Sequence, residues 1–195
     1  MITRDKIIFF NTAWMEQYNG NWIVDVPING GRWVNENKFG GEVFNFQPLQ
    51  SILYGYVEPG LVEKNGRQRN INISRLSTRP GSKVGNSISN ILVVWVATPK
   101  NVKRAFMMGW YENATVFRIA QPPPTGSNRI WPHQDNPIKY FTSANEQDCV
   151  LLPVERRTCV IPGKGRGFGR SNIWYAEDNL ETKNRVIEFI NNWRK

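Results

Sequence analysis

Catalytic centres commonly use thiol, imidazole and carboxylate side chains, and this chain has few thiol and imidazole groups. There is one histidine, His133, and there are two cysteines, Cys149 and Cys159. A triad with a serine or cysteine nucleophile would need His133 as its base, but nothing in the sequence beside either cysteine supports that role. One histidine and two cysteines cannot fill a typical structural zinc site. We therefore predict no catalytic residue, no metal and no cofactor.

Carboxylates give the one pattern that hints at catalysis. A two-metal nuclease needs paired acidic residues and commonly a nearby lysine. Glu42 on an expected strand, Glu58, and the pair Glu63 and Lys64 supply these residue types, although without the strand context of a known nuclease. A small nuclease of unrecognised type stays one alternative, and a binding module that is not an enzyme is favoured over it.

Positive charge is the strongest compositional signal. The 195 residues contain 25 Lys and Arg against 16 Asp and Glu, for a net charge of +9 and a pI near 9.8. The charge gathers in two blocks, residues 64–111, which hold no acidic residue, and residues 150–195. Such a balance indicates a polyanionic partner, with nucleic acid the leading one. The alternative is a pair of solvated loops without a partner.

Two loop-like segments carry much of this charge. One is a basic insertion near residues 64–90, rich in Asn, Gly and Ser, and the other is the glycine-rich run 163–170. The glycine-rich run matches neither the Walker pattern nor GxGxxG, but Lys and Arg on such a loop can follow a phosphate backbone. The candidate phosphate-binding residues are Arg67, Arg69, Arg75, Arg79, Lys164, Arg166 and Arg170.

Aromatic residues suggest how a base would be held. Most of the eight Trp must fill the core. Trp33, however, follows Gly30-Gly31-Arg32, and Trp131 lies in an expected loop, positions that suit a pocket wall stacking on a planar base. The candidate base-pocket residues are Trp22, Trp33, Trp110, Tyr111 and Trp131, and core packing is the alternative for each.

Short apolar runs separated by Gly and Pro predict the strands that would position these residues. The expected strands cover residues 7–10, 42–46, 54–57, 91–97, 106–111, 115–118, 139–142 and 149–152, with a hairpin turn at 112–114. We expect a short helix at 13–20 and a C-terminal helix near 179–193, capped by Asp178 with Glu181 in a capping box. Residues 1–195 are thus predicted to form one α+β domain, a small, mostly antiparallel β-barrel with peripheral helices.

Several segments resemble the PUA-like superfamily of small β-barrels, in the branch that holds the EVE and YTH domains. The resemblance lies in residues 40–46, 54–57, 91–98, 108–111 and 115–118, and covers about two-thirds of the chain. Residues 109–118 and 171–176 are also similar to reader modules attached to bacterial modification-dependent restriction enzymes. The long basic insertion departs from compact EVE domains.

The resemblance implies a domain that binds nucleic acid and accepts a flipped or modified base in an aromatic pocket, without catalysis. The expected function is recognition of modified double-stranded DNA in a restriction or defence setting, with a nuclease domain or subunit as a candidate partner. A phosphorothioate mark is an allowed variant, and an RNA-binding PUA-like protein without modification specificity is a further alternative. Without a signal peptide or a long apolar segment, a cytoplasmic location away from membranes is expected.

Overall fold

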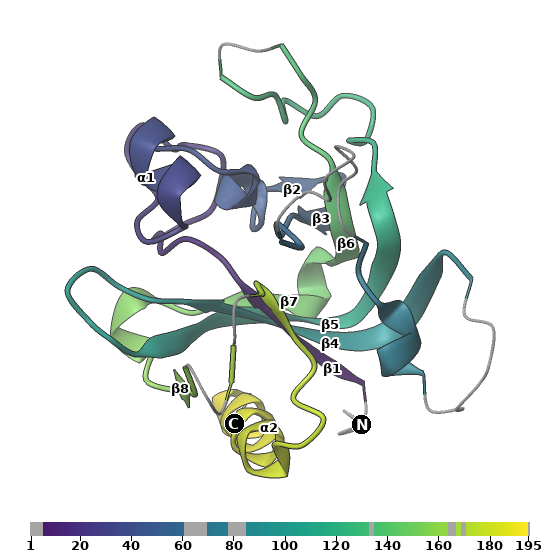
Figure 1. The fold of residues 1–195 in the computed structure, drawn as a ribbon. Helices are drawn as coiled ribbons and strands as arrows, with labels where there is room; N and C mark the ends of the chain where they lie inside the picture. The colour runs from purple at the N-terminus through teal and green to yellow at the C-terminus, as the bar shows by residue number, and fades with distance from the viewer. Residues whose placement is uncertain are drawn as a thin grey trace.

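The computed structural model describes residues 6–60, 70–77, 85–132, 135–163, 167–168 and 171–194. Within them the chain forms one nine-stranded mixed sheet in the order β2-β3-β6-β5-β4-β1-β9, with β7 and β8 also pairing with β5 (Figure 1). The strands are β1 (Ile7–Asn11), β2 (Pro48–Leu49), β3 (Ile52–Gly55), β4 (Ser87–Ala97), β5 (Ala105–Gln121), β6 (Tyr140–Asn145), β7 (Cys149–Leu151), β8 (Val160–Ile161) and β9 (Ile173–Trp174).

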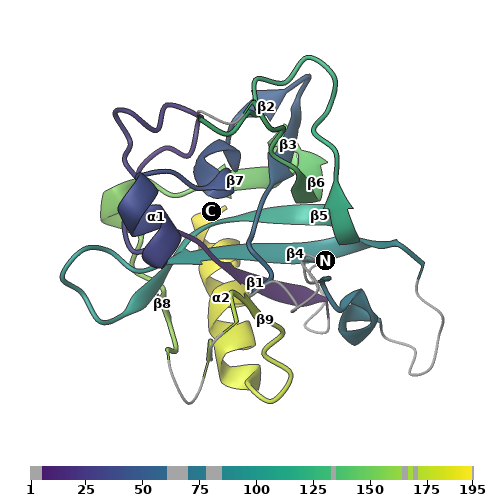
Figure 2. The ribbon, with the colours of Figure 1, turned by 45° about the horizontal axis from the view of Figure 1, so that its top comes forward.

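Helices are few and peripheral in this described part of the chain. The α-helices are α1 (Arg32–Asn37) and α2 (Leu180–Trp193), and the 3-10 helices are η1 (Gly41–Phe44), η2 (Ile73–Leu76), η3 (Glu146–Asp148) and η4 (Val154–Arg156). Helix α2 lies across one face of the sheet, under β1 and β4 (Figure 2), and buries Val186 and Ile190 against it. The predicted α+β class and C-terminal helix are confirmed. The arrangement of the described strands is a mixed sheet, and closure into a barrel stays a prediction.

Strand β1 divides the hydrophobic core. It runs parallel to β4, from the pair Ile7 and Leu92 to the pair Asn11 and Val96. Alternate side chains of a strand point to opposite faces of the sheet. Ile8 and Phe10 accordingly belong to one buried cluster, and Ile7 and Phe9 to the cluster beneath α2. A strand buried on both faces reads as a continuous apolar run, which is why residues 7–10 predicted it well.

The hairpin expected over residues 106–118 is wrong, because these residues lie in the single long strand β5. Asn113 has a left-handed backbone (φ 51°), and the register of β4 against β5 shifts between Ile91 and Val93. Asn tolerates this conformation better than most residues. The polar residues after Tyr111 therefore mark a bulge in a continuous strand, where the pattern suggested a turn.

Two other local predictions are also wrong. Much of the segment 42–46 is the 3-10 helix η1, because the Asn45 side chain takes the place of a strand partner by bonding the backbone N–H and C=O of Tyr56 at 2.8 and 3.0 Å. Residues 13–20 are not helical. There the Asp25 carboxylate accepts the backbone N–H groups of Glu16, Gln17 and Tyr18 at 2.6–3.0 Å, which holds an irregular loop.

Parts of the basic insertion at 64–90 lie outside the described residues. Of the remainder, residues 73–76 form η2 and residues 87–90 begin β4. The two cysteines are not joined to each other. None of the helices in the described part of the chain has the length and apolar character needed to traverse a lipid bilayer.

Helix α2 begins one residue later than its capping pattern predicts. The Asn179 side chain is the N-cap and accepts the backbone N–H of Thr182 at 3.0 Å, whereas the expected cap, Asp178, is exposed. An N-cap side chain satisfies a helix-end N–H group that otherwise has no partner in the helix. Asn is as good a cap as Asp, so the sequence alone favoured the wrong one of two neighbours.

We expect Asn179→Ala to lower the free energy of unfolding by about 0.5–2 kcal/mol, because it removes the acceptor for the N–H of Thr182. Asp178→Ala is the matched control and should change stability much less. Urea unfolding of both variants measures the difference. An equal loss in both, or a larger loss in the Asp178 variant, would contradict the observed cap.

Candidate functional site

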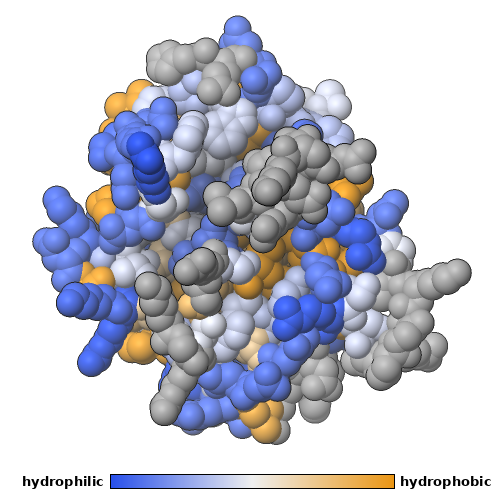
Figure 3. All heavy atoms as spheres, in the orientation of Figure 1, coloured by the Kyte–Doolittle hydropathy of each residue, from blue (hydrophilic) through white to orange (hydrophobic). Residues whose placement is uncertain are grey.

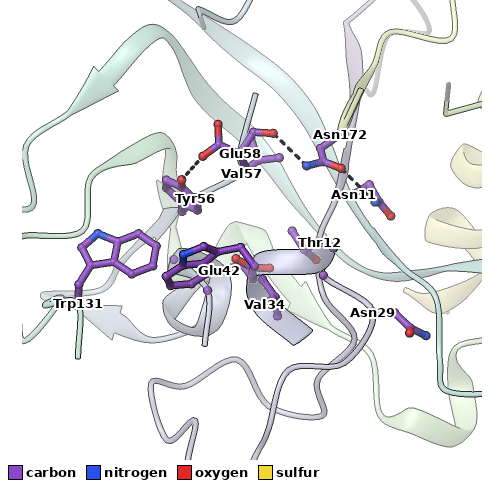
Figure 4. Close-up of a pocket in the computed structure, with 15 residues that line it drawn as sticks. Asn11, Thr12, Asn29, Val34, Glu42, Tyr56, Val57, Glu58, Trp131 and Asn172 are labelled. Carbon is purple, nitrogen blue, oxygen red and sulfur yellow. Dashed lines mark hydrogen bonds between the residues drawn. The ribbon is translucent and has the colours of Figure 1, made fainter. Parts of the chain in front are cut away.

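A cavity of about 570 Å³ opens beside the end of β1 (Figure 4). Segments far apart in sequence meet there: the end of β1, the start of α1, η1, the residues after β3, the loop carrying Trp131, and Asn172 before β9. Its lining includes indole, phenol, amide, hydroxyl and carboxyl groups. No Lys, Arg or His is among the described residues that line it. The interior therefore suits a neutral or cationic group better than a phosphate.

Aromatic rings form one wall of the cavity. The rings of Trp33 and Trp131 meet edge to face, with centroids 5.2 Å apart and planes at 88°. Tyr56 meets Trp131 at 6.3 Å and 87°. Such perpendicular contacts are favourable between aromatic rings. The exposed fraction of Trp33 is 45%, so its ring is available to a planar ligand at the mouth.

Two glycines allow this wall to lie close to the sheet. A Cβ atom on Gly30 would come within 2.8 Å of side-chain carbons of Ala13 and Val34. Gly31 has φ +93°, a backbone conformation that other residues rarely adopt. The glycine pair before Trp33 thus turns the chain into α1 and lets the helix pack against the residues that follow β1.

Arg129 holds the loop that carries Trp131. Its guanidinium is buried, with only 3% of the residue exposed, and donates to the carbonyl oxygens of Phe44 and Tyr54 at 3.2 and 2.7 Å. Burial lowers the pKa of Arg129 to about 10. No pattern in the sequence singled out Arg129, which lies two residues before Trp131. In the structure, its hydrogen bonds connect that loop to η1 and β3.

Amide side chains line the side of the cavity opposite Trp131 in Figure 4. The Asn11 side-chain amide donates to the side-chain oxygen of Asn172 at 3.3 Å, and Asn172 donates to the backbone oxygen of Glu58 at 3.1 Å. The backbone N–H of Asn11 also donates to the carbonyl of Asn172 at 2.8 Å. These bonds join β1, the residues after β3 and the approach to β9 around the cavity.

Two carboxyl groups face the same cavity. Glu42 is 7% exposed, and its Oε1 accepts the backbone N–H of Ala13 at 3.1 Å. Burial raises the pKa of Glu42 above its ordinary 4.5, and the charge of Glu58 raises it further. Glu58 accepts the Tyr56 hydroxyl at 2.6 Å, and partial burial raises its pKa too. A carboxyl with a raised pKa can both donate and accept hydrogen bonds.

The structure brings together two of the five candidate base-pocket residues, Trp33 and Trp131. Trp22 packs edge to face on Phe39, which in turn contacts Trp131, but Trp22 does not line the cavity. Trp110 and Tyr111 are fully buried in the two separate core clusters. Consecutive strand residues face opposite sides of a sheet, so these two could not have shared one pocket wall.

Of the candidate phosphate-binding residues, only Arg75 lies within the described residues. Its guanidinium pairs with both carboxylate oxygens of Glu177 at 2.7 Å and lies 4.1 Å over the Tyr175 ring. This pairing raises the pKa of Arg75 and lowers that of Glu177. The residues outside the described part are Arg67, Arg69, Arg79, Lys164, Arg166 and Arg170, together with His133, Glu63 and Lys64.

Comparisons with known proteins add no family assignment. No protein-family model matches the chain, and searches of curated proteins and of solved structures find no match either. In the part of the chain that the structure describes, no group of three or more His, Cys, Asp or Glu side chains is placed to hold a metal ion.

We expect Glu42 to make stability fall as the pH rises. The pKa of Glu42 is higher in the folded protein than its ordinary 4.5. Between pH 4.5 and the raised pKa, the native state therefore keeps a proton that the unfolded chain releases. Its contribution to stability therefore decreases from pH 4.5 up to the raised value. Urea unfolding between about pH 4 and pH 8 should show the wild type losing stability relative to Glu42→Gln.

Glu36→Gln is the matched control, because Glu36 is an exposed glutamate on α1. Its stability should follow the wild type at each pH. Parallel curves for the wild type and Glu42→Gln would contradict a buried, titrating Glu42.

Proposed function

We propose that this protein is a binding module that reads modified nucleic acid, with double-stranded DNA as its ligand. A modified base would enter the cavity, and phosphates would meet cationic side chains outside it. The observation that carries the proposal is the cavity itself, in which two perpendicular indoles face amide and carboxyl groups. Recognition without catalysis, a PUA-like barrel and a role in restriction or defence belong to the same proposal.

The size and chemistry of the cavity support a base as its occupant. Small-molecule pockets commonly enclose about 300–1,000 Å³ and combine apolar walls with a few placed polar groups. A flipped base is read by hydrogen bonds along its edge and by stacking between aromatic side chains. Trp33 supplies a stacking ring, and Asn11, Asn172 and Glu42 supply hydrogen-bonding groups.

The separation of charges supports the same ligand. The chain carries a net charge of +9, yet the described lining of the cavity holds carboxyl groups and no cation. Phosphate contacts generally position a nucleic acid, while contacts to base edges carry specificity. A cation-free cavity in a strongly basic protein fits that separation.

The test is a binding panel of labelled duplexes: plain DNA, DNA with 5-methylcytosine, 5-hydroxymethylcytosine or phosphorothioate, and a matched RNA. We expect a preference of about tenfold or more, roughly 1.4 kcal/mol, for one mark. Trp33→Ala should remove most of that preference, because stacking of a base on an aromatic ring contributes about 1–3 kcal/mol. The half-exposed position of Trp33 leaves the core intact.

Trp33→Phe is the control that keeps an aromatic ring, and it should retain most of the preference. Val24→Ala, at an exposed loop position, should behave as wild type. Equal affinity for all duplexes and RNA would favour a general RNA- or DNA-binding protein and would contradict modification reading.

A second candidate is a metal-dependent nuclease, favoured by the presence of Glu42 and Glu58 in one cavity. If it holds, labelled duplex will be cut in the presence of Mg²⁺ or Mn²⁺, and Glu58→Gln will abolish cutting while binding is retained. Full binding of an intact duplex with either metal present would contradict it.

A further inference from the structure

The turn between β4 and β5 carries cations that the candidate phosphate residues did not include. We call residues 98–104 the β4–β5 tip. It contains Lys100, Lys103 and Arg104, all exposed. No acidic residue occurs from residue 98 to residue 111. The tip projects at the left edge of Figure 1, where Figure 3 shows hydrophilic side chains standing out from the surface.

Asn29 joins the β4–β5 tip to the cavity. Asn29 is one of the residues that line the cavity, and its side-chain amide nitrogen donates to the backbone oxygens of Thr98 and Pro99 at 3.1 and 3.0 Å. Lys100 therefore directly follows Pro99, which is bonded to a residue of the cavity lining. The start of β5, directly after the tip, is also held in place, because Ala105 and Phe106 pair with Ile161 and Val160 of β8.

The three cations of the tip differ from several arginines in the described part of the chain. Arg32, Arg75 and Arg194 each pair with a glutamate, and Arg129 and Arg157 are buried and bonded to backbone oxygens. No ion pair is formed there by Lys100, Lys103 or Arg104. Unbalanced cations close together repel one another, and a polyanion removes that cost.

We propose that the β4–β5 tip binds the phosphodiester groups that flank the nucleotide in the cavity. This inference rests on the proposed function and adds its phosphate-binding residues. A base that enters the cavity stays covalently joined to its two neighbouring phosphates, so those phosphates must lie near the cavity mouth. Asn29, a residue of the cavity lining, holds the backbone directly before Lys100, so the cations of the tip extend from a segment attached to the cavity. The tip therefore supplies affinity, and the cavity supplies discrimination.

The test is the double variant Lys100→Gln, Lys103→Gln. Each lost phosphate contact lowers the slope of log affinity against log salt by about 0.9 for duplex DNA, so we expect a decrease of about 2. Affinity at low salt should fall to the same extent for modified and plain duplexes, which leaves their ratio unchanged. Both residues are exposed, and circular dichroism will verify the fold.

The matched control is Lys6→Gln, Arg156→Gln, which removes the same charge elsewhere. Lys6 precedes β1, whose far end reaches the cavity, and Arg156 lies in η4 against Trp193. The control should keep most of the wild-type slope. Equal slopes in the two double variants would overturn the assignment to the tip while leaving the reader proposal intact. Absence of wild-type binding to any duplex at low salt would overturn both.

Discussion

The structure depends on the burial of β1 against β4. Ile8 and Phe10 enter one core cluster, and Ile7 and Phe9 enter the cluster beneath α2. Full burial of such side chains contributes about 1.5–3 kcal/mol each, as an upper estimate. The same strand ends at Asn11, and the next residue bonds its backbone N–H to Val96 at 2.9 Å. The core thus places Asn11 and Thr12 directly at the cavity.

The cavity shows how few interactions are needed to bring distant segments to one place. Arg129 ties the Trp131 loop to η1 and β3, and Asn172 bridges Asn11 and the backbone of Glu58. Each uses a buried or partly buried polar group with more than one partner. A polar group removed from water costs free energy unless it is hydrogen-bonded, so the bonds made by Nη1 of Arg129 and by the two Asn side chains favour one arrangement of the loops over others.

Continuous apolar runs predicted the elements that the structure confirms. Residues 7–10, residues 91–97 and the C-terminal helix were found because burial of one or both faces leaves a local periodic signal. The errors have a different cause. Asn45 replaces a strand partner by its side chain, Asp25 holds residues that looked helical, and Asn113 bulges a strand that looked like a turn. Asn45 and Asp25 override the pattern through contacts that are not visible locally, and Asn113 does so through its left-handed backbone conformation.

The sequence by itself determined a basic, aromatic-rich α+β chain, two indoles in glycine-rich or loop settings, and a C-terminal helix. These follow from composition and from short-range periodicity. The tertiary structure alone decided that Trp33 and Trp131 meet, that Trp110 and Tyr111 are core, and that Glu42 and Glu58 share a cavity. It also bonded Asn29, a residue of the cavity lining, to Pro99, the residue before Lys100. Those outcomes depend on contacts between residues far apart in the chain, and such contacts leave no periodic signal in any one segment.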